Sequence, residues 1–267
     1  MQESSLNKCK NWPRHEIFSK TRIPLETSFF VRLDGWRFKR LSRTINAEKP
    51  FDDKFAKCVV YSGRILFTKS FNPTLVYVAS DELNILFLDR GPFSRRVEKT
   101  NSVLTGLISS AFSLNPQRFF DEKPVVAFDS RVVVASTEEK IVEYLSWRQI
   151  NAWRNHNNAY AYYNAYAYWM FYKMGYKPSK IARKLKGLRT EELHEVMFKQ
   201  GVNLAKTPQW QRRGILMYKQ PFSKKVENHT VTRWMIRENW NLPLFTSKEG
   251  AKLIHQILKW AKEKRKN

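Results

Sequence analysis

The first half of the chain alternates between two hydrophobic periods, and the order of these periods limits the folds open to it. Apolar residues recur at every second position in some segments, as at Phe29, Val31 and Leu33, and at helical spacing in others. The expected elements are, in chain order, a strand at 28–33, a helix at 51–67, strands at 74–79 and 83–88, a helix at 94–112, and one or two strands within 124–134. This β-α-β-β-α-β order predicts an α+β fold of the ferredoxin-like type, an antiparallel sheet with helices on one face.

Acidic residues occur where two of the expected strands end. Asp34 follows the first strand, and Asp81 and Glu82 lie in the turn between the second and third. Because the ferredoxin-like topology brings these places together, we expect the three side chains to lie close to one another. Carboxylate oxygens bind hard divalent cations such as Mg²⁺, and the carbonyl of Gly35 is a further candidate ligand. The alternative is that these acids only cap turns.

Basic residues that suit phosphate lie near the predicted carboxylate cluster in the sequence. Arg37 and Lys39 follow the first carboxylate, and Lys49 precedes the first helix. Arg96 and Lys99 lie at the start of the second helix, where the helix dipole and the positive side chains both favour an anion. A solvated basic face is the alternative for each of them.

The net charge indicates a polyanionic partner. The 267 residues include 48 Lys and Arg against 24 Asp and Glu, a formal net charge of +24. Residues 1–136 contain 22 basic and 14 acidic residues, whereas 137–267 contain 26 and 10. So large a surplus exceeds what solubility requires, and its concentration in the second half predicts that this half binds the polyanion.

The second half reads as mainly helical. We expect one long helix, or two joined by a kink, over 138–174, then two shorter helices split at Gly187 within 178–200, a turn-rich or hairpin segment at 201–219, and a last helix from about 247. A dense basic run includes four residues that we predict to bind RNA: Lys180, Arg183, Lys184 and Lys186. The tyrosines and asparagines of 155–168 could stack on bases, but burial between helices or subunits is favoured.

Several classes of protein are disfavoured. The two cysteines are too few for a disulfide framework or a four-thiolate zinc site, and the five histidines show no zinc spacing. No apolar run suits a membrane span or a signal peptide, and no Walker loop or dinucleotide fingerprint occurs. These features predict a cytoplasmic protein without a membrane partner.

Six blocks of residues follow one another along the chain: Leu33-Asp34-Gly35-Trp36-Arg37-Phe38, Lys49-Pro50-Phe51-Asp52, Ser80-Asp81-Glu82, Phe128-Asp129-Ser130-Arg131-Val132-Val133, Tyr144-Leu145-Ser146-Trp147-Arg148-Gln149 and Lys186-Gly187. In sequence and in order, these blocks resemble the tRNA-His guanylyltransferase family and its 3′-to-5′ polymerase relatives. The stretch 147–156, together with 201–203 and 208–214, looks like the archaeal branch.

The resemblance implies a polymerase-like palm over 1–136 and a mainly helical RNA-binding and oligomerisation region over 137–267, closely packed on the palm. It implies addition of guanosine from GTP to the 5′ end of tRNA in the 3′-to-5′ direction, after that end has been activated with ATP or GTP. The enzyme would be a homotetramer that uses two Mg²⁺ ions. The catalytic residues would be Asp34, Asp81 and Glu82, with Asp34, Gly35 and Asp81 as metal ligands. The nucleotide would contact Gly35, Trp36, Arg37, Phe38, Lys39, Lys49, Ser80, Arg96 and Lys99. Arg148 and Asn155 would join the basic run in binding RNA.

Departures from the family pattern bear on substrate choice. The chain lacks the His-Ile-Asn-Asn block of eukaryotic and bacterial members and the Lys-Asn-Glu lysine of eukaryotic members. The resemblance therefore implies addition directed by the base opposite the growing 5′ end, either in maturation of tRNA-His or in repair of truncated 5′ ends. Two other functions remain open, a palm-type nucleotide cyclase and a non-catalytic RNA-binding module.

Overall fold

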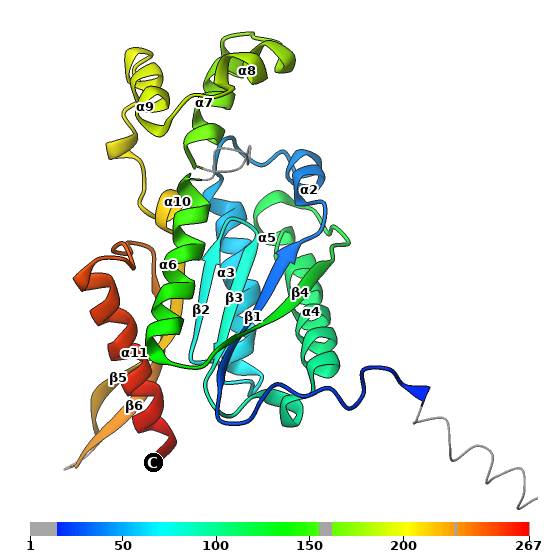
Figure 1. Cartoon of the computed structure of the whole chain (residues 1–267), viewed down its shortest axis with the longest axis vertical. Coiled ribbons are helices and arrows are strands. Elements are labelled where there is room, and N and C mark those ends of the chain that lie inside the picture. Colours follow the sequence, from blue (N-terminus) through cyan, green and yellow to red (C-terminus); the bar gives the residue numbers. More distant parts are fainter. Residues whose placement is uncertain (1–14, 155–161, 227–228, 267) are drawn as a thin grey trace, which may run out of the picture.

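The computed structural model describes residues 15–154, 162–226 and 229–266, and these build a six-stranded antiparallel sheet (Figure 1). The strand order is β4-β1-β3-β2-β5-β6. The bounds are Ser28–Gly35 for β1, Leu75–Ala79 for β2, Glu82–Phe87 for β3, Phe128–Ala135 for β4, Ile215–Val226 for β5 and His229–Asn239 for β6. The first four strands have the ferredoxin-like order, which confirms the predicted α+β fold.

Two helices of the first half cover one face of the sheet. They are α3 (Asp53–Thr68) and α4 (Val97–Leu114), and they pack against the apolar residues of β1 that recur at every second position. Asp52 begins α3 as its N-cap, because its side chain accepts a hydrogen bond from the backbone N–H of Phe55 at 3.0 Å. This layer forms the larger part of the hydrophobic core.

Two helices of the second half cover the opposite face. Residues of α6 (Glu138–Arg154) and α11 (Lys248–Lys266) form a second core with the strand residues that point to this face, such as Phe30. The ring of Tyr144 stacks on that of Phe30, with 4.2 Å between the ring centroids. The helices that belong to the ferredoxin-like unit thus lie on one face, as expected, and the second half adds a layer on the other. All five residues of β2 are buried for this reason.

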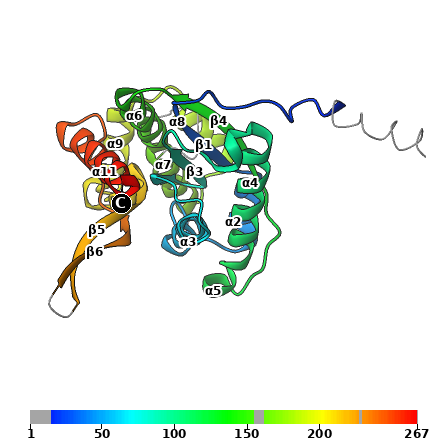
Figure 2. The ribbon, with the colours of Figure 1, turned by 90° about the horizontal axis from the view of Figure 1, so that it is seen from below.

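The second half also extends the sheet itself. Its hairpin of β5 and β6 joins the edge of β2, with Leu75 opposite Tyr218 and Val78 opposite Ile215. The sequence indicated only a turn-rich or hairpin segment at 201–219, because the polar residues of the outer hairpin obscure its strand pattern. Figure 2 shows this hairpin reaching away from the body of the protein.

A lobe of three helices lies beyond the end of the sheet at which β1 and β2 finish (Figure 1). It consists of α7 (Tyr162–Lys173), α8 (Pro178–Leu185) and α9 (Thr190–Lys199). The split near Gly187 was predicted, whereas the connection between α6 and α7 lies outside the described residues. The short elements are α2 (Phe38–Thr44), α5 (Gln117–Phe120), α10 (Trp210–Arg213), η2 (Pro92–Arg95) and η3 (Leu204–Lys206). No helix in the described ranges is both long and apolar enough to cross a bilayer.

The junction between α10 and β5 requires a glycine. Gly214 has a φ of 76°, and a Cβ added there would lie 2.4 Å from the carbonyl oxygen of Val78. We expect Gly214→Ala to lower the free energy of unfolding by about 2 kcal/mol or more, because the backbone of β2 cannot yield. Urea unfolding measures the change. Gly106→Ala is the control: nothing lies within 4 Å of its added Cβ. In the middle of α4 this alanine should stabilise by about 0.5–1 kcal/mol. Equal midpoints for the two variants would contradict the prediction.

Candidate active site

The site lies where β1 and the hairpin of β2 and β3 end side by side. Leu33 pairs with Leu83 across β1 and β3, which places Asp34 next to Glu82 along the register. Ala79 pairs with Glu82 and closes a two-residue turn formed by Ser80 and Asp81. The structure therefore brings together the three acidic residues that the topology predicted.

The electrostatics of Asp34 and Asp81 are those of crowded carboxylates. Burial, and then the charges of Glu82 and Asp129, raise the pKa of Asp34 above its usual value. Burial, and then the charge of Asp34, raise the pKa of Asp81 to about 7. Both shifts mean that this environment disfavours the charged form of the two carboxyl groups. A bound cation would relieve the repulsion.

Glu82 has a different environment, since its carboxylate is already paired. Arg148 Nε donates to Glu82 Oε1 at 2.9 Å, and Arg148 Nη2 donates to Oε2. Asn84 Nδ2 also donates to Oε1, at 2.8 Å, and Arg32 Nε lies 4.0 Å from Oε2. Glu82 is only 8% exposed. Both carboxylate oxygens of Glu82 thus already accept hydrogen bonds from protein donors.

The loop after β1 separates core residues from surface residues. The Phe38 side chain is 4% exposed and packs on the rings of Phe112 and Phe128, so only its backbone remains available to a nucleotide. This corrects the prediction for that side chain. A Cβ on Gly35 would lie 2.4 Å from the Phe38 ring, so glycine is needed there. Trp36 is 58% exposed, with the Arg37 guanidinium 4.4 Å from its ring centroid. The Trp36 and Arg37 side chains are therefore open to solvent beside the carboxylates, and their contact with a nucleotide stays a prediction.

Lys49 lies on the loop that leads into α3. Its Nζ donates to Ser42 Oγ at 2.7 Å. Burial, and to a smaller extent the charge of Arg43, lower the pKa of Lys49 despite the opposing effect of Asp52. Within the part of the chain that the structure describes, no carboxylate forms an ion pair with it. A half-buried ammonium group in this state favours an incoming anion.

Arg96 and Lys99 lie at the other end of the sheet. The backbones of Arg96 and Arg22 form an isolated antiparallel β-bridge. The N–H of Val97 donates to the carbonyl of Thr21 at 3.1 Å, near the start of β1. The length of β1 separates them from Asp34 by roughly 20 Å. Within one chain they are not part of the site, which corrects the prediction. Helix spacing identified α4 but not the direction in which its start points.

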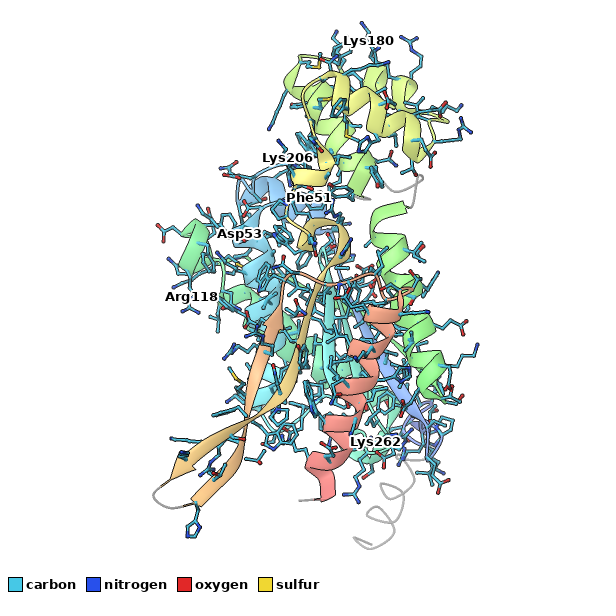
Figure 3. The ribbon with its side chains drawn as sticks, turned by 90° about the vertical axis from the view of Figure 1, so that its left-hand side faces the viewer. Phe51, Asp53, Arg118, Lys180, Lys206 and Lys262 are labelled. Atoms are coloured by element: carbon cyan, nitrogen blue, oxygen red, sulfur yellow. The ribbon has the colours of Figure 1, made fainter. Side chains whose placement is uncertain are left out.

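The cations predicted to bind RNA lie on the lobe, with one exception. Lys180, Arg183 and Lys184 are exposed on α8, and Lys186 is exposed just after it. Figure 3 shows Lys180 at the outer end of the lobe, far from Lys262 on α11. Arg148 instead contacts Glu82, so its role in binding RNA stays a prediction. Asn155 lies outside the described residues.

Two tyrosines of the aromatic segment have structural roles. Tyr162 is buried in the lobe and donates to the carbonyl of Leu204 at 3.1 Å, and the hydroxyl of Tyr166 donates to Gln211 Oε1 at 2.6 Å. The preference for burial over base stacking is confirmed for Tyr162, while Tyr166 is half-buried.

Two parts of the site were not predicted. Asp129 of β4 lies opposite Asp34, and Asn84 receives a hydrogen bond from the Tyr144 hydroxyl at 2.7 Å while it donates to Glu82. The aspartate lies in one of the blocks that carried the resemblance, but only the strand register shows which residue it faces.

Comparison with known proteins covers both halves of the chain. The family model described as tRNAHis guanylyltransferase matches residues 10–136, and the model described as Thg1 C terminal domain matches 139–266. The chain is 26% identical over 208 residues to the tRNA(His) guanylyltransferase of Schizosaccharomyces pombe, covering 76% of this chain and 78% of the relative. It is 29% identical over 225 residues to that of Saccharomyces cerevisiae, covering 81% and 91%.

Solved structures agree with this relationship. The crystal structure of the Saccharomyces cerevisiae tRNA(His) guanylyltransferase superimposes with a TM-score of 0.67 at 26% identity, covering 77% of this chain and 90% of that one. A bacterial guanylyltransferase-like protein in complex with ATP gives 0.72 at 21% identity, covering 93% and 97%, and supports the fold. With one family model on each half and relatives that span most of its length, the chain belongs to the tRNAHis guanylyltransferase family.

Proposed function

We propose that this chain is a nucleotidyltransferase that adds guanosine from GTP to the 5′ end of tRNA, with tRNA-His as the favoured substrate. Membership of the family supports the reaction. The observation that carries it to this chain is the meeting of Asp34 and Asp81 at the ends of adjacent strands, both with a raised pKa. A pure RNA-binding module gains nothing from acids that repel phosphate, and a cyclase has no need of a basic lobe.

The carboxylate pair fits Mg²⁺. Asp34, Asp81 and the carbonyl of Gly35 would hold the metal, and two ions are proposed. Across the described residues, no three His, Cys, Asp or Glu side chains form a metal-binding group, so phosphate oxygens and water would complete the coordination. When bound, the ions lower the pKa of an attacking hydroxyl and neutralise the triphosphate.

The chain's own cations and backbone would bind and orient the nucleotide. Arg37, Lys39 and Lys49 would pair with phosphates, and Trp36 and Ser80, which follow β1 and β2, would contact the nucleotide. Solved bacterial relatives were obtained in complex with ATP and with GTP. We propose that the 5′-monophosphate of the tRNA first attacks the α-phosphorus of ATP or GTP and releases pyrophosphate. The 3′-hydroxyl of the incoming GTP then loses its proton and attacks the activated 5′ phosphorus, and the nucleoside monophosphate leaves.

The lobe would bind the tRNA backbone. Its exposed cations on α8 lie beyond the end of the sheet that bears the carboxylates, so a bound RNA could extend from the site onto the lobe (Figure 1). A homotetramer and a cytoplasmic location remain predictions, as does division into a palm at 1–136 and an RNA-binding region at 137–267. The shared sheet supports close packing of these two regions.

We expect Asp34→Asn and Asp81→Asn each to lower single-turnover guanosine addition by at least about a thousandfold, because each removes a ligand of the ions that activate the nucleophile and neutralise the triphosphate. The measurement is incorporation of labelled GTP into 5′-monophosphorylated tRNA with Mg²⁺. Glu143→Gln, an exposed carboxylate on α6, is the matched control and should retain parental rates.

Unfolding measurements show whether an inactive variant is folded. A carboxyl group with a raised pKa destabilises the folded protein above that pKa, and the penalty fades as the pH falls toward the unfolded value. Without divalent ions, Asp81→Asn should therefore unfold at a higher temperature than the parent at pH 8, and the difference should shrink below pH 7. A folded Asp81→Asn protein with near-parental rates would refute the assignment.

Neutralising the lobe should weaken tRNA binding specifically. We expect the variant with glutamine at Lys180, Arg183, Lys184 and Lys186 to reduce the slope of log affinity against log salt by about two to four, because fewer counterions are released. GTP binding should not change. Filter binding over a salt series gives the slope. The control replaces four lysines outside the lobe, namely Lys20, Lys69, Lys123 and Lys140. Equal slopes for the two quadruple variants would place the RNA contact elsewhere.

We propose that the base opposite the growing 5′ end selects the nucleotide. The chain lacks the His-Ile-Asn-Asn block and the Lys-Asn-Glu lysine. Pairing of the incoming nucleotide with the opposing base would therefore align its 3′-hydroxyl with the activated phosphate, and loss of that alignment slows the reaction. All four nucleotides should be compared on tRNAs that differ only at the opposing base. Cytosine there should favour GTP. Equal guanosine addition opposite adenine and cytosine would show that the protein makes the choice.

A further inference from the structure

We propose that Arg148 is a positioning residue for the reaction: by pairing with Glu82 it fixes the turn that presents Asp81 to Asp34. This inference rests on the proposed function. It gives Arg148 a role other than binding RNA, and it gives Glu82 a role that does not require contact with an ion or with substrate.

The contact is specific and enclosed. The guanidinium of Arg148 engages both oxygens of Glu82, through Nε at 2.9 Å and through Nη2. The two side chains are 17% and 10% exposed. Asn84, itself held by the Tyr144 hydroxyl, donates to the same carboxylate. Bidentate pairing of this kind fixes orientation as well as distance.

The position of Glu82 in the chain explains how this contact reaches the site. Glu82 is the first residue of β3 and follows Asp81 directly, and its backbone pairs with Ala79 to close the turn. A side chain held at this point restricts the rotation of the turn. The carboxylate of Asp81 is thereby fixed relative to β1.

The helix that bears Arg148 is itself firmly anchored. The next residue, Gln149, donates from Nε2 to the carbonyls of Arg213 at 3.1 Å and Pro243 at 3.2 Å. Its Oε1 accepts from the N–H of Phe245 at 2.8 Å. The second half of the chain thus supplies a rigid support for the catalytic turn of the first half.

Charge gives a second reason for the pair. Glu82 lies beside two carboxylates that already repel each other, and an unpaired charge on it would add to that repulsion. Arg148 balances Glu82, whereas among the described residues no basic side chain forms an ion pair with Asp34 or Asp81. The cation would then be attracted to those two carboxylates, since Asp129 beside them pairs with Arg131 at 3.5 Å.

The experiment compares Arg148→Lys, Arg148→Met, Glu82→Gln and the double variant Glu82→Gln/Arg148→Met with the parent. Lys140→Met, on the exposed surface of α6, is the control for loss of a positive charge. Three quantities are measured: kcat and KM for guanosine addition, the affinity of the RNA-free protein for Mg²⁺ with GTP by calorimetry, and the Kd for tRNA. Calorimetry does not depend on activity, so it tests positioning even if the parent adds no guanosine, a result that would refute the proposed function.

We expect Arg148→Met to lower kcat and the affinity for Mg²⁺ with GTP by about 10–100-fold, as for other groups that orient metal ligands, while the Kd for tRNA stays within about twofold. Arg148→Lys should retain part of the activity, since it keeps the charge and loses the second hydrogen bond. In kcat and in affinity for Mg²⁺ with GTP, the double variant should lose no more than the more impaired of the two single variants, because the effects of residues that act as one unit do not add. It also avoids an unpaired buried charge, so it keeps the test valid if Arg148→Met fails to fold.

Two results would overturn the proposal. If Arg148→Met weakens tRNA binding but leaves the affinity for Mg²⁺ with GTP unchanged, Arg148 contacts RNA. If the losses of the single variants multiply in the double variant, Glu82 acts on the ions or the substrate independently of Arg148.

Discussion

The antiparallel pairing of β3 with both β1 and β2 is the constraint on which the rest of the site depends. It sets the end of β1 beside a two-residue turn, so that Asp34 and Asp81 meet although 47 positions separate them in the sequence. A slip of one residue would move each side chain to the other face of the sheet. Apolar side chains of β1 are buried on both faces of the sheet, Phe29, Val31 and Leu33 on one and Phe30 on the other, and this burial holds the register in place.

The site concentrates negative charge where the fold alone would avoid it. Burying carboxylates beside one another costs free energy at neutral pH, as the raised pKa values of Asp34 and Asp81 show. The protein neutralises Glu82 with arginine, whereas among the described residues no arginine forms an ion pair with Asp34 or Asp81. This difference between adjacent acids suits a site that receives a metal ion together with phosphate groups. Basic side chains on the neighbouring loops would pair with the phosphates.

The two halves of the chain are joined through the sheet and not only through an interface. The second half adds β5 and β6 to the edge of β2 and covers the face that the first half leaves open. One consequence is that α6, from the second half, contacts the catalytic turn of the first. The helical lobe then extends from the same end of the sheet (Figure 1).

The sequence by itself determined the order of elements in the first half, the adjacency of Asp34 to Asp81, the split of helices at Gly187 and the basic run on α8. Each of these follows from periods or residue types within a short stretch, or from a topology with few alternatives. Only the tertiary structure decided the burial of the Phe38 ring, the distant location of Arg96 and Lys99, and the pairing of Arg148 with Glu82. These depend on the direction in which each element runs and on contacts between residues far apart in the chain, which no local pattern encodes.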